Sequence, residues 1–407
     1  MGQMINGADT AWLLISSVLV LLMTLPALAL FYAGLVQAKN ILSILIQCIA
    51  VTSLMSLLWV LGVYNEAFSG TAPFIGNLSH ALLWHISRGA VHPGTHIPES
   101  VFVMFQMTFA VITPALIIGA YAERIRFSAV LMFSALWLIV VYAPVTHWVW
   151  GGGWLGKLGV MDYAGGIVVH VTAGTSALVI AAMLGPREGF RRSINPPHAP
   201  WMVMVGASFL WVGWFGFNAG SALVSGGDAG MTMLSTHLSA ATATLTWIAI
   251  ERIGFGKPSL VGAVTGTIAG LAAITPASGY VGPLGAIVLG FIAALVCYAS
   301  VQVVKHRFKV DDALDVLGVH GIGGAIGTLL LPFLVFVGAG GVALPRSASA
   351  QFLIQLEGVA SVALWSAVAS FVIVKLTTMT VGLRVDRDTE IQGLDFASHG
   401  ETGYNYD

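Results

Sequence analysis

The sequence predicts an all-α polytopic membrane protein with eleven transmembrane helices, and three observations support this fold class. The first is composition: of 407 residues, 57% are hydrophobic and only 9% are charged, whereas soluble domains carry about 25% charged residues. The second is that apolar runs of roughly 20 residues, long enough to cross a bilayer, recur along the chain. The third is that these runs lack the alternation of membrane β-barrels. Because backbone groups in lipid must be satisfied within their own segment, the runs should be helices.

The eleven apolar runs are separated mostly by short loops. We expect the spans to begin near Ala11, Ile41, Glu99, Phe127, Asp162, His198, Thr232, Pro258, Gly282, Ala313 and Gln351. The eleventh run continues to about Gly382, which is long enough for a tilted helix. We therefore divide the chain into a transmembrane domain, residues 1–383, and a polar tail, residues 384–407.

The distribution of basic residues predicts the orientation of the chain. Of the 17 lysines and arginines, all except Arg88, Lys157 and Arg346 fall in the loops after odd-numbered spans, in the tail or at its junction with the last span. Loops rich in lysine and arginine face the cytoplasm. The N-terminus should therefore lie outside and the tail in the cytoplasm, which agrees with an odd number of spans.

Two histidines lie in the middle of membrane-length segments, and each follows an aspartate. His170 lies eight residues after Asp162, and His320 lies five residues after Asp315. An imidazole inside a bilayer is costly unless it is paired or faces a cavity, and its pKa near neutrality lets it accept or pass a proton. We interpret the histidines as a polar pair in a pore that handles a proton or a small polar solute.

The two histidines have two other interpretations. Backbone carbonyls could satisfy both rings in a packed core. A metal site would need a third and a fourth ligand, and neither histidine lies in an HExxH-type motif. The two cysteines, Cys48 and Cys297, stand singly in apolar spans and are interpreted as core residues. We therefore expect no metal and no cofactor.

The positions of the histidine segments predict an internal repeat. They lie in the fifth and tenth expected spans, and a separation of five spans reverses the orientation of an equivalent segment. This predicts two inverted five-helix halves plus a long eleventh helix, with a site between the halves. The shared pattern is short: Val-His-x-x-x-Gly recurs, ending at Gly174 and Gly324, while the two aspartate–histidine spacings differ.

Asp162 and Asp315 each stand near the start of a histidine span. A carboxylate at such a position can cap backbone N–H groups and meet the positive end of the helix dipole. This structural role is the one we favour. The functional alternative is that the negative charge helps attract a cation at the mouth of a pore.

Aromatic residues recur near the expected outer ends of several spans. Phe105 and Phe109 are four residues apart and should share a helix face. The aromatic and hydroxyl side chains that complete this group are Trp148, Trp150, Trp214, Phe217 and Ser221. Lipid-facing packing and the interfacial aromatic belt are one interpretation. The other is a cation–π cage for a small cation, with the hydroxyl of Ser221 as a hydrogen-bond acceptor beside it.

Taken together, many collinear motifs resemble the bacterial branch of the ammonium transporter (Amt/MEP) family, within the Amt/MEP/Rh superfamily, over essentially the whole chain. The matching segments are residues 31–35, 122–126, 162–170, 213–221, 256–259, 310–312, 315–320, 393–395 and 398–401. The resemblance implies a homotrimer with one pore through each subunit. It also implies a bacterial inner-membrane location and a tail that communicates between subunits. PII-type signalling proteins would block the pore at the cytoplasmic face.

The resemblance also implies roles for individual residues. Those matching the outer ammonium site are Phe105, Phe109, Trp150 and Ser221, with Asp162 needed for a working site. Phe109 and Phe217 match a stacked phenylalanine gate, and His170 and His320 match the twin histidines of the hydrophobic pore. The expected function is ammonium or ammonia transport, and the alternative is an ammonium sensor that signals through the tail. Neither enzymatic activity nor nucleic-acid binding is expected.

One outer loop is less similar to the family. Between Asn77 and Pro98 it holds the histidines His80, His85, His92 and His96. A metal-binding loop and a solvated loop are the two interpretations, and we favour the solvated loop.

Overall fold

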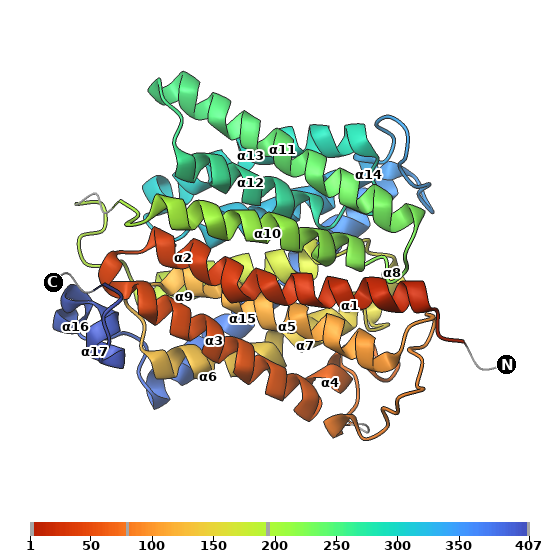
Figure 1. Ribbon diagram of the computed structural model, residues 1–407, viewed down its shortest axis with the longest axis horizontal. Coiled ribbons are helices and arrows are strands. Elements are labelled where there is room, and N and C mark those ends of the chain that lie inside the picture. The colour runs from red at the N-terminus through yellow and green to blue at the C-terminus, as the bar shows by residue number, and fades with distance from the viewer. Residues whose placement is uncertain (1–3, 79–80, 193–195, 405–407) are drawn as a thin grey trace.

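The computed structural model describes residues 4–78, 81–192 and 196–404. Within these ranges the protein is a bundle of long helices that run side by side along its longest axis (Figure 1). The same ranges contain no β-strand, and their β-type pairing is limited to two isolated bridges. The prediction of an all-α fold is therefore confirmed.

The longer helices lie close to the expected spans. They are α1 (Gly7–Leu22), α2 (Ala29–Leu35), α3 (Ile41–Leu58), α5 (Glu99–Tyr121), α6 (Phe127–Trp137), α7 (Ala143–Val149), α9 (Thr172–Leu184), α10 (Pro200–Gly220), α11 (Gly227–Phe255), α12 (Leu260–Ile274), α13 (Pro283–Gln302), α14 (Ile322–Leu334) and α15 (Ala348–Thr380). Short helices complete the fold: α4 (Tyr64–Phe68), α8 (Trp154–Leu158), α16 (Arg387–Gln392) and α17 (Leu394–His399). The last long helix has 33 residues, as the long eleventh run predicted.

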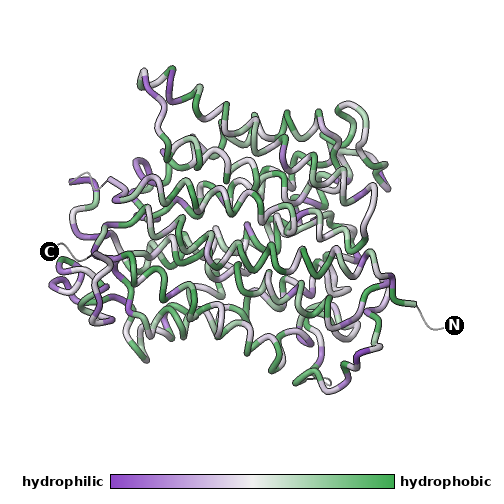
Figure 2. Tube along the Cα trace, viewed as in Figure 1, coloured by the Kyte–Doolittle hydropathy of each residue, from purple (hydrophilic) through white to green (hydrophobic). Residues whose placement is uncertain are grey.

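Nine segments of the described chain are long and apolar enough to cross a membrane. They cover all the expected spans except the seventh and eighth, which correspond to α11 and α12. Helix α12 has only 15 residues, and α11 is interspersed with serine and threonine, which lowers its hydropathy. Apolar residues dominate the long helices, and polar residues gather toward the ends of the bundle (Figure 2). The chain is a multi-pass membrane protein.

Several long helices contain a widened π-helical turn. One such turn, Met23–Leu28, joins α1 to α2 and contains Pro26, which has no N–H to donate. Two others, Gly166–Val171 and Leu317–Gly321, lead into α9 and α14 and carry His170 and His320. Single π-helical turns are frequent at functional sites because they redirect side chains.

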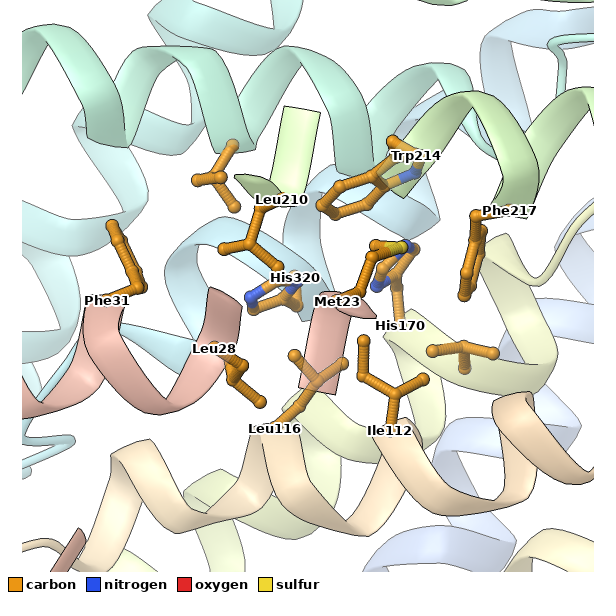
Figure 3. A pocket seen from close by; sticks show the side chains of 12 residues that line it. Met23, Leu28, Phe31, Ile112, Leu116, His170, Leu210, Trp214, Phe217 and His320 are labelled. Carbon is orange, nitrogen blue, oxygen red and sulfur yellow. The ribbon is translucent and has the colours of Figure 1, made fainter. Parts of the chain in front are cut away.

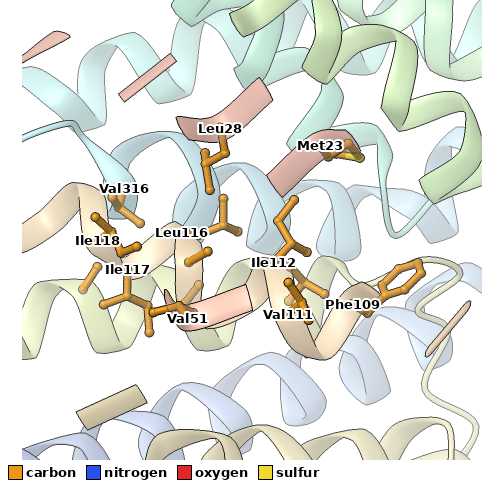
Figure 4. Close-up of a cluster of buried hydrophobic side chains, with 14 of the residues drawn as sticks. Met23, Leu28, Val51, Phe109, Val111, Ile112, Leu116, Ile117, Ile118 and Val316 are labelled. Atoms are coloured by element: carbon orange, nitrogen blue, oxygen red, sulfur yellow. The ribbon is translucent and has the colours of Figure 1, made fainter. Parts of the chain in front are cut away.

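Helix α5 lies at the centre of the bundle. Over the most apolar stretch of 18 residues in α5, 89% of the residues are buried, compared with 33% over such a stretch in α15. Side chains of α5 such as Ile112 and Leu116 pack among buried side chains of neighbouring segments (Figure 4). The exposed apolar face of α15 suits contact with lipid. Inside a bilayer this core is stabilised by close van der Waals packing and interhelical hydrogen bonds, because lipid is as apolar as the packed side chains.

The two ends of the chain lie at opposite ends of the bundle. The chain enters α1 at one end, and the tail helices α16 and α17 lie at the other (Figure 1). The tail is anchored at the start of α3, where the Asp395 carboxylate accepts backbone hydrogen bonds from Leu42 (3.0 Å) and Ser43 (2.7 Å).

Candidate functional site: a pore with two buried histidines

A cavity of about 430 Å³ opens near the N-terminal end of the bundle. We call it the outer cavity, after the side of the membrane on which the sequence predicts this end to lie. Its lining includes Phe109, Trp150 and Ser221, three of the four residues expected at the outer site. The fourth, Phe105, does not line the cavity but packs behind Phe109, with ring centroids 5.1 Å apart and planes at 70°. The cavity lining therefore combines aromatic rings with polar side chains such as His92, Gln106 and Ser221.

Hydrogen bonds hold Trp150 and Ser221 in place. The indole N–H of Trp150 donates to the carbonyl of Asp162 (2.8 Å), and its ring stands edge-on to Phe109 at 89°. The Ser221 hydroxyl donates to the carbonyl of Phe217 (2.8 Å), so its oxygen can still accept a hydrogen bond. Aromatic faces beside a free acceptor suit a small cation that carries N–H donors.

Two tryptophans of the expected group lie elsewhere. The indole of Trp148 donates to the carbonyl of Phe74 (2.7 Å), and its ring packs against Trp154 and Trp365. Trp148 is thus a packing residue beside the cavity, not part of its lining. Trp214 lies deeper, next to His170, and its indole donates to the Thr275 hydroxyl (2.8 Å).

The inner end of the outer cavity is closed by two phenylalanine rings. Phe109 and Phe217 stack with centroids 4.2 Å apart and planes at 30°. Both side chains are almost fully buried. Beyond them lies a space of only about 10 Å³, enough for about one water-sized molecule, with a lining that is apolar except for two histidines and the indole of Trp214.

The two histidines lie side by side in this narrow space. Their ring centroids are 5.2 Å apart with planes at 21°, between Phe217 on one side and Phe31 on the other (Figure 3). Among the described residues, neither nitrogen of His170 and not Nδ1 of His320 has a hydrogen-bond partner, although all three atoms are buried. Buried polar atoms are normally paired. These nitrogens are therefore available to a small polar guest, and carbonyls do not satisfy them.

Close backbone contact between the segments that carry His170 and His320 lets the two rings lie side by side. A Cβ atom added at Gly174 would lie 2.3 Å from the Cα of Gly321, and one added at Gly324 would lie 2.6 Å from the Cβ of His170. Both distances are far below van der Waals contact. The glycines found four residues after each histidine thus have a packing reason.

Asp162 fixes the turn that leads into the His170 segment. One carboxylate oxygen accepts N–H groups of Gly165 (2.9 Å) and Gly166 (2.6 Å), and the other accepts those of Ile167 (2.8 Å) and Val168 (3.0 Å). Burial raises the pKa of the Asp162 carboxyl, and the four N–H donors partly offset that rise. The structure thus shows the capping arrangement that the sequence favoured.

Asp315 does not have the same arrangement, so the expectation that it caps the start of its span as Asp162 does is wrong. The Asp315 carboxylate pairs with Lys305 at 2.7 Å, while the backbone N–H of Leu317 donates to Asp312 (2.7 Å). Burial, with a smaller contribution from Asp315, raises the pKa of Asp312 to about 6. Asp312 precedes His320 by eight residues, the spacing that separates Asp162 from His170. This equal spacing was visible in the sequence and would have identified Asp312.

A third space completes the route toward the other end of the bundle. This inner cavity has a volume of about 240 Å³, and its lining includes Phe31, Lys305, Asp315 and His320. His320 and Phe31 border both the narrow space and the inner cavity. Four features therefore follow one another through the protein: the outer cavity, the phenylalanine pair, the histidine pair and the inner cavity.

The described histidines of the loop between Asn77 and Pro98 do not gather into a group that could bind a metal. Among the described residues no group of three histidine, cysteine, aspartate or glutamate side chains could hold a metal ion; His80 lies outside those residues. His85 pairs with Glu99 (3.2 Å). His92 stacks on Phe102 at 3.5 Å and lines the outer cavity, a position that the sequence did not predict. Burial lowers the pKa of His92 to about 4, although Glu99 opposes that shift.

Comparison with known proteins identifies the family. A sequence model of the Ammonium Transporter Family matches residues 11–404. The ammonium transporter of Bacillus subtilis is 43% identical, covering 97% of this chain and 98% of its own length. The ammonium transporter Amt1 of Archaeoglobus fulgidus is 40% identical, covering 98% of this chain and all of its own length (100%).

Solved structures give the same result. The crystal structure of Saccharomyces cerevisiae Mep2 superposes with a TM-score of 0.85 at 32% identity, over 95% of this chain and 92% of that chain. A structure titled Sensor Amt Protein superposes with a TM-score of 0.90 at 29% identity, over 96% of this chain and 98% of that chain. The chain belongs to the Ammonium Transporter Family, a family of membrane transporters rather than enzymes.

Proposed function

We propose that the protein transports ammonium across the bacterial inner membrane, through a pore within each chain. The observation that carries this proposal is the pair of buried histidines, placed between a phenylalanine pair and an inner cavity, in which both nitrogens of His170 and Nδ1 of His320 have no partner among the described residues. Membership of the Ammonium Transporter Family supports ammonium as the substrate.

The first step of the proposed mechanism is recruitment of the cation. Phe109, Trp150 and Ser221 line the outer site, with Phe105 supporting Phe109 from behind, and the faces of the lining rings with the Ser221 oxygen replace part of the hydration shell of NH4+. Each cation–π contact is worth about 0.5–2 kcal/mol. Asp162 acts here through geometry, since its carbonyl holds Trp150 and its carboxylate holds the turn.

The second step separates the proton from ammonia. Moving an unpaired charge into an apolar space costs many kcal/mol, so the ion loses a proton near the Phe109–Phe217 gate. Neutral ammonia then enters the narrow space, where the nitrogens of His170 and His320 offer hydrogen bonds. The histidines relay the proton separately, and ammonia leaves through the inner cavity.

The assembly belongs to the same proposal. We infer eleven spans in two inverted five-helix halves plus a long eleventh helix, with the N-terminus outside and residues 384–407 as a cytoplasmic regulatory tail. The opposite placement of the two chain ends and the equal aspartate–histidine spacing support this topology. A homotrimer in membrane lipid, and a PII-type protein at the cytoplasmic face, are what family membership suggests. Relatives named ammonium transporters favour transport over the alternative role of a sensor signalling through the tail.

Current on a solid-supported membrane tests the proposed function. Purified protein in liposomes is given an ammonium jump, and we expect a sustained current that is reduced in the Asp162→Ala and Phe109→Ala variants. An internal pH change without current would show neutral ammonia conduction through the same pore. Absence of both signals would contradict transport.

The double variant His170→Ala with His320→Ala tests the histidine relay in the same liposomes. We expect selective ammonium flux to be lost, because the narrow space then has no polar nitrogen except the bonded indole of Trp214. Normal selective flux in the double variant would rule out the relay.

A further inference from the structure

Two buried glutamines stand one helical turn apart on α15, the last membrane-spanning helix. Gln351 and Gln355 are both 0% exposed. Polar side chains at such positions in a membrane helix are costly unless they are paired, and they often mark a functional site. Neither glutamine is among the site residues that the sequence predicts, and the proposed mechanism does not use them.

Both amides bind the turn that leads to the outer site. The Gln355 side chain accepts the backbone N–H of Met161 (2.8 Å) and donates to the carbonyl of the same residue (2.6 Å). Gln351 donates to the carbonyl of Gly159 (2.9 Å) and to the amide oxygen of Gln355 (3.1 Å). One side chain thus fixes both backbone polar groups of Met161, and a second fixes the chain two residues earlier.

Asp162 directly follows Met161, the residue that Gln355 holds. Its carbonyl holds the indole of Trp150, which lines the outer cavity, and its carboxylate caps the backbone of residues 165–168. His170 follows two residues later. A continuous chain of hydrogen bonds therefore runs from α15, through Met161 and Asp162, to the outer aromatic site and to the segment that carries His170.

The geometry of these hydrogen bonds matters because the position of Asp162 depends on contacts outside its own turn. A carboxylate that accepts four N–H groups at 2.6–3.0 Å needs a turn of one shape, and the residues before it are held from outside the turn, by another helix. Errors of about 1 Å in a binding site are enough to reduce activity strongly.

We propose that Gln355, supported by Gln351, is a positioning residue of the outer ammonium site and acts through the Met161–Asp162 turn. The inference rests on the proposed function. Gln355 does not touch the substrate: it sets where Asp162 and Trp150 lie.

The test is the substitution Gln355→Met, which keeps the length and apolar volume of the side chain but removes both hydrogen bonds to Met161. In proteoliposomes we expect the KM for ammonium-driven current to rise about fivefold or more, as loss of a well-made hydrogen bond implies. Gln351→Met removes a single bond to the turn and should raise KM less. It also provides a second variant if Gln355→Met does not fold.

Gln47→Met is the matched control. Gln47 is a buried glutamine on α3, and among the described residues its amide donates only to Ser43 of its own helix. The chemical change and the burial are the same, but the outer turn is not involved. KM should therefore stay at the wild-type value.

A readout independent of transport separates positioning from general destabilisation. Hydrogen–deuterium exchange at the backbone amides of Met161 and residues 165–168 should accelerate in Gln355→Met and not in Gln47→Met. Unchanged exchange there, or an unchanged KM in a folded Gln355→Met protein, would overturn the positioning role. Wild-type protein without ammonium-driven signal would instead contradict the proposed function, while the exchange result would still decide the role of Gln355.

Discussion

At the scale of single residues, the proposed pore depends on which polar atoms have hydrogen-bond partners and which have none. The carboxylate oxygens of Asp162 are saturated with N–H donors, whereas the nitrogens of His170 have no partner among the described residues. The first pattern is that of a structural cap, and the second is that of a group awaiting a guest. Of two buried polar residues in one short segment, Asp162 thus stabilises the backbone, whereas His170 can bind a small molecule.

Substitution of Asp162 separates its charge from its capping geometry. Asp162→Asn keeps one oxygen that can accept N–H bonds, while Asp162→Ala keeps none. Since four N–H groups depend on this side chain, we expect transport to fall in Asp162→Asn and to fall further, with a loss of about 2 kcal/mol or more of stability, in Asp162→Ala. Current in proteoliposomes and thermal unfolding in detergent measure the two effects. Equal and complete loss of transport in both variants, with unchanged stability, would point instead to the charge itself.

At the scale of elements, the π-helical turns and the glycines determine where the histidines meet. Residues 166–171 and 317–321 depart from the regular α-helix where each carries its histidine. Helices can approach closely where small residues face each other. The segments touch at Gly174 and Gly321, so the distance between the rings depends on backbone contact and not only on the rings themselves.

Gly174→Ala tests this contact between elements. The new methyl group would overlap the Cα of Gly321, so the segments that carry His170 and His320 must separate. We expect a loss of roughly 1–3 kcal/mol of stability, with reduced ammonium current. Gly230→Ala is the control, because α11 leaves open space at that position. A Gly174→Ala protein that melts and conducts as the control does would contradict the close-packing explanation.

At the scale of the whole molecule, an ion-pair cluster joins loops at the end of the bundle where the tail lies. The Arg187 guanidinium binds Glu123 (2.6 Å) and Asp311 (2.9 Å), which belong to segments far apart in the sequence. Burial acts to raise the pKa of Asp311, but the hydrogen bonds and charge of Arg187 outweigh it and hold that pKa below its ordinary value. Breaking a buried pair is costly because the remaining charge is left without a partner.

The cluster predicts a pH dependence of stability. A carboxyl whose pKa is lower in the folded state contributes stability above its unfolded pKa, near 3.9, and loses that contribution as pH falls through the folded pKa. Asp311→Asn should therefore lower the melting temperature at pH 7.5, and the difference from the wild type should shrink below about pH 4. Thermal unfolding in detergent at both pH values measures this. Glu401→Gln, at an exposed site in the tail, should show no difference; a difference for Asp311→Asn that stays constant with pH would exclude the ionic explanation.

Much of the architecture could be predicted because hydropathy is a local property. Runs of about 20 apolar residues cross a bilayer whatever else they contact, so the membrane class, the approximate span positions and the long last helix follow from the sequence. The histidines could be identified for the same reason, since a polar ring in the middle of an apolar run is visible in the sequence before its partners are known. Asp315 was expected to cap its span because it is the aspartate nearest to His320, whereas the eight-residue spacing and the hydrogen bond from Leu317 both identify Asp312 as the counterpart of Asp162.

The sequence by itself therefore determined that this is a helical membrane protein with two histidines, His170 and His320, in apolar spans. Only the tertiary structure decided which aromatic residues line the cavity, since Trp148 and Phe105 turn to other partners while Trp150 faces it. Likewise, the tertiary structure alone brought Gln355 to Met161, across nearly 200 residues of chain. The physical reason is that hydropathy and the cost of burial belong to individual residues, whereas partners depend on how distant helices pack against one another.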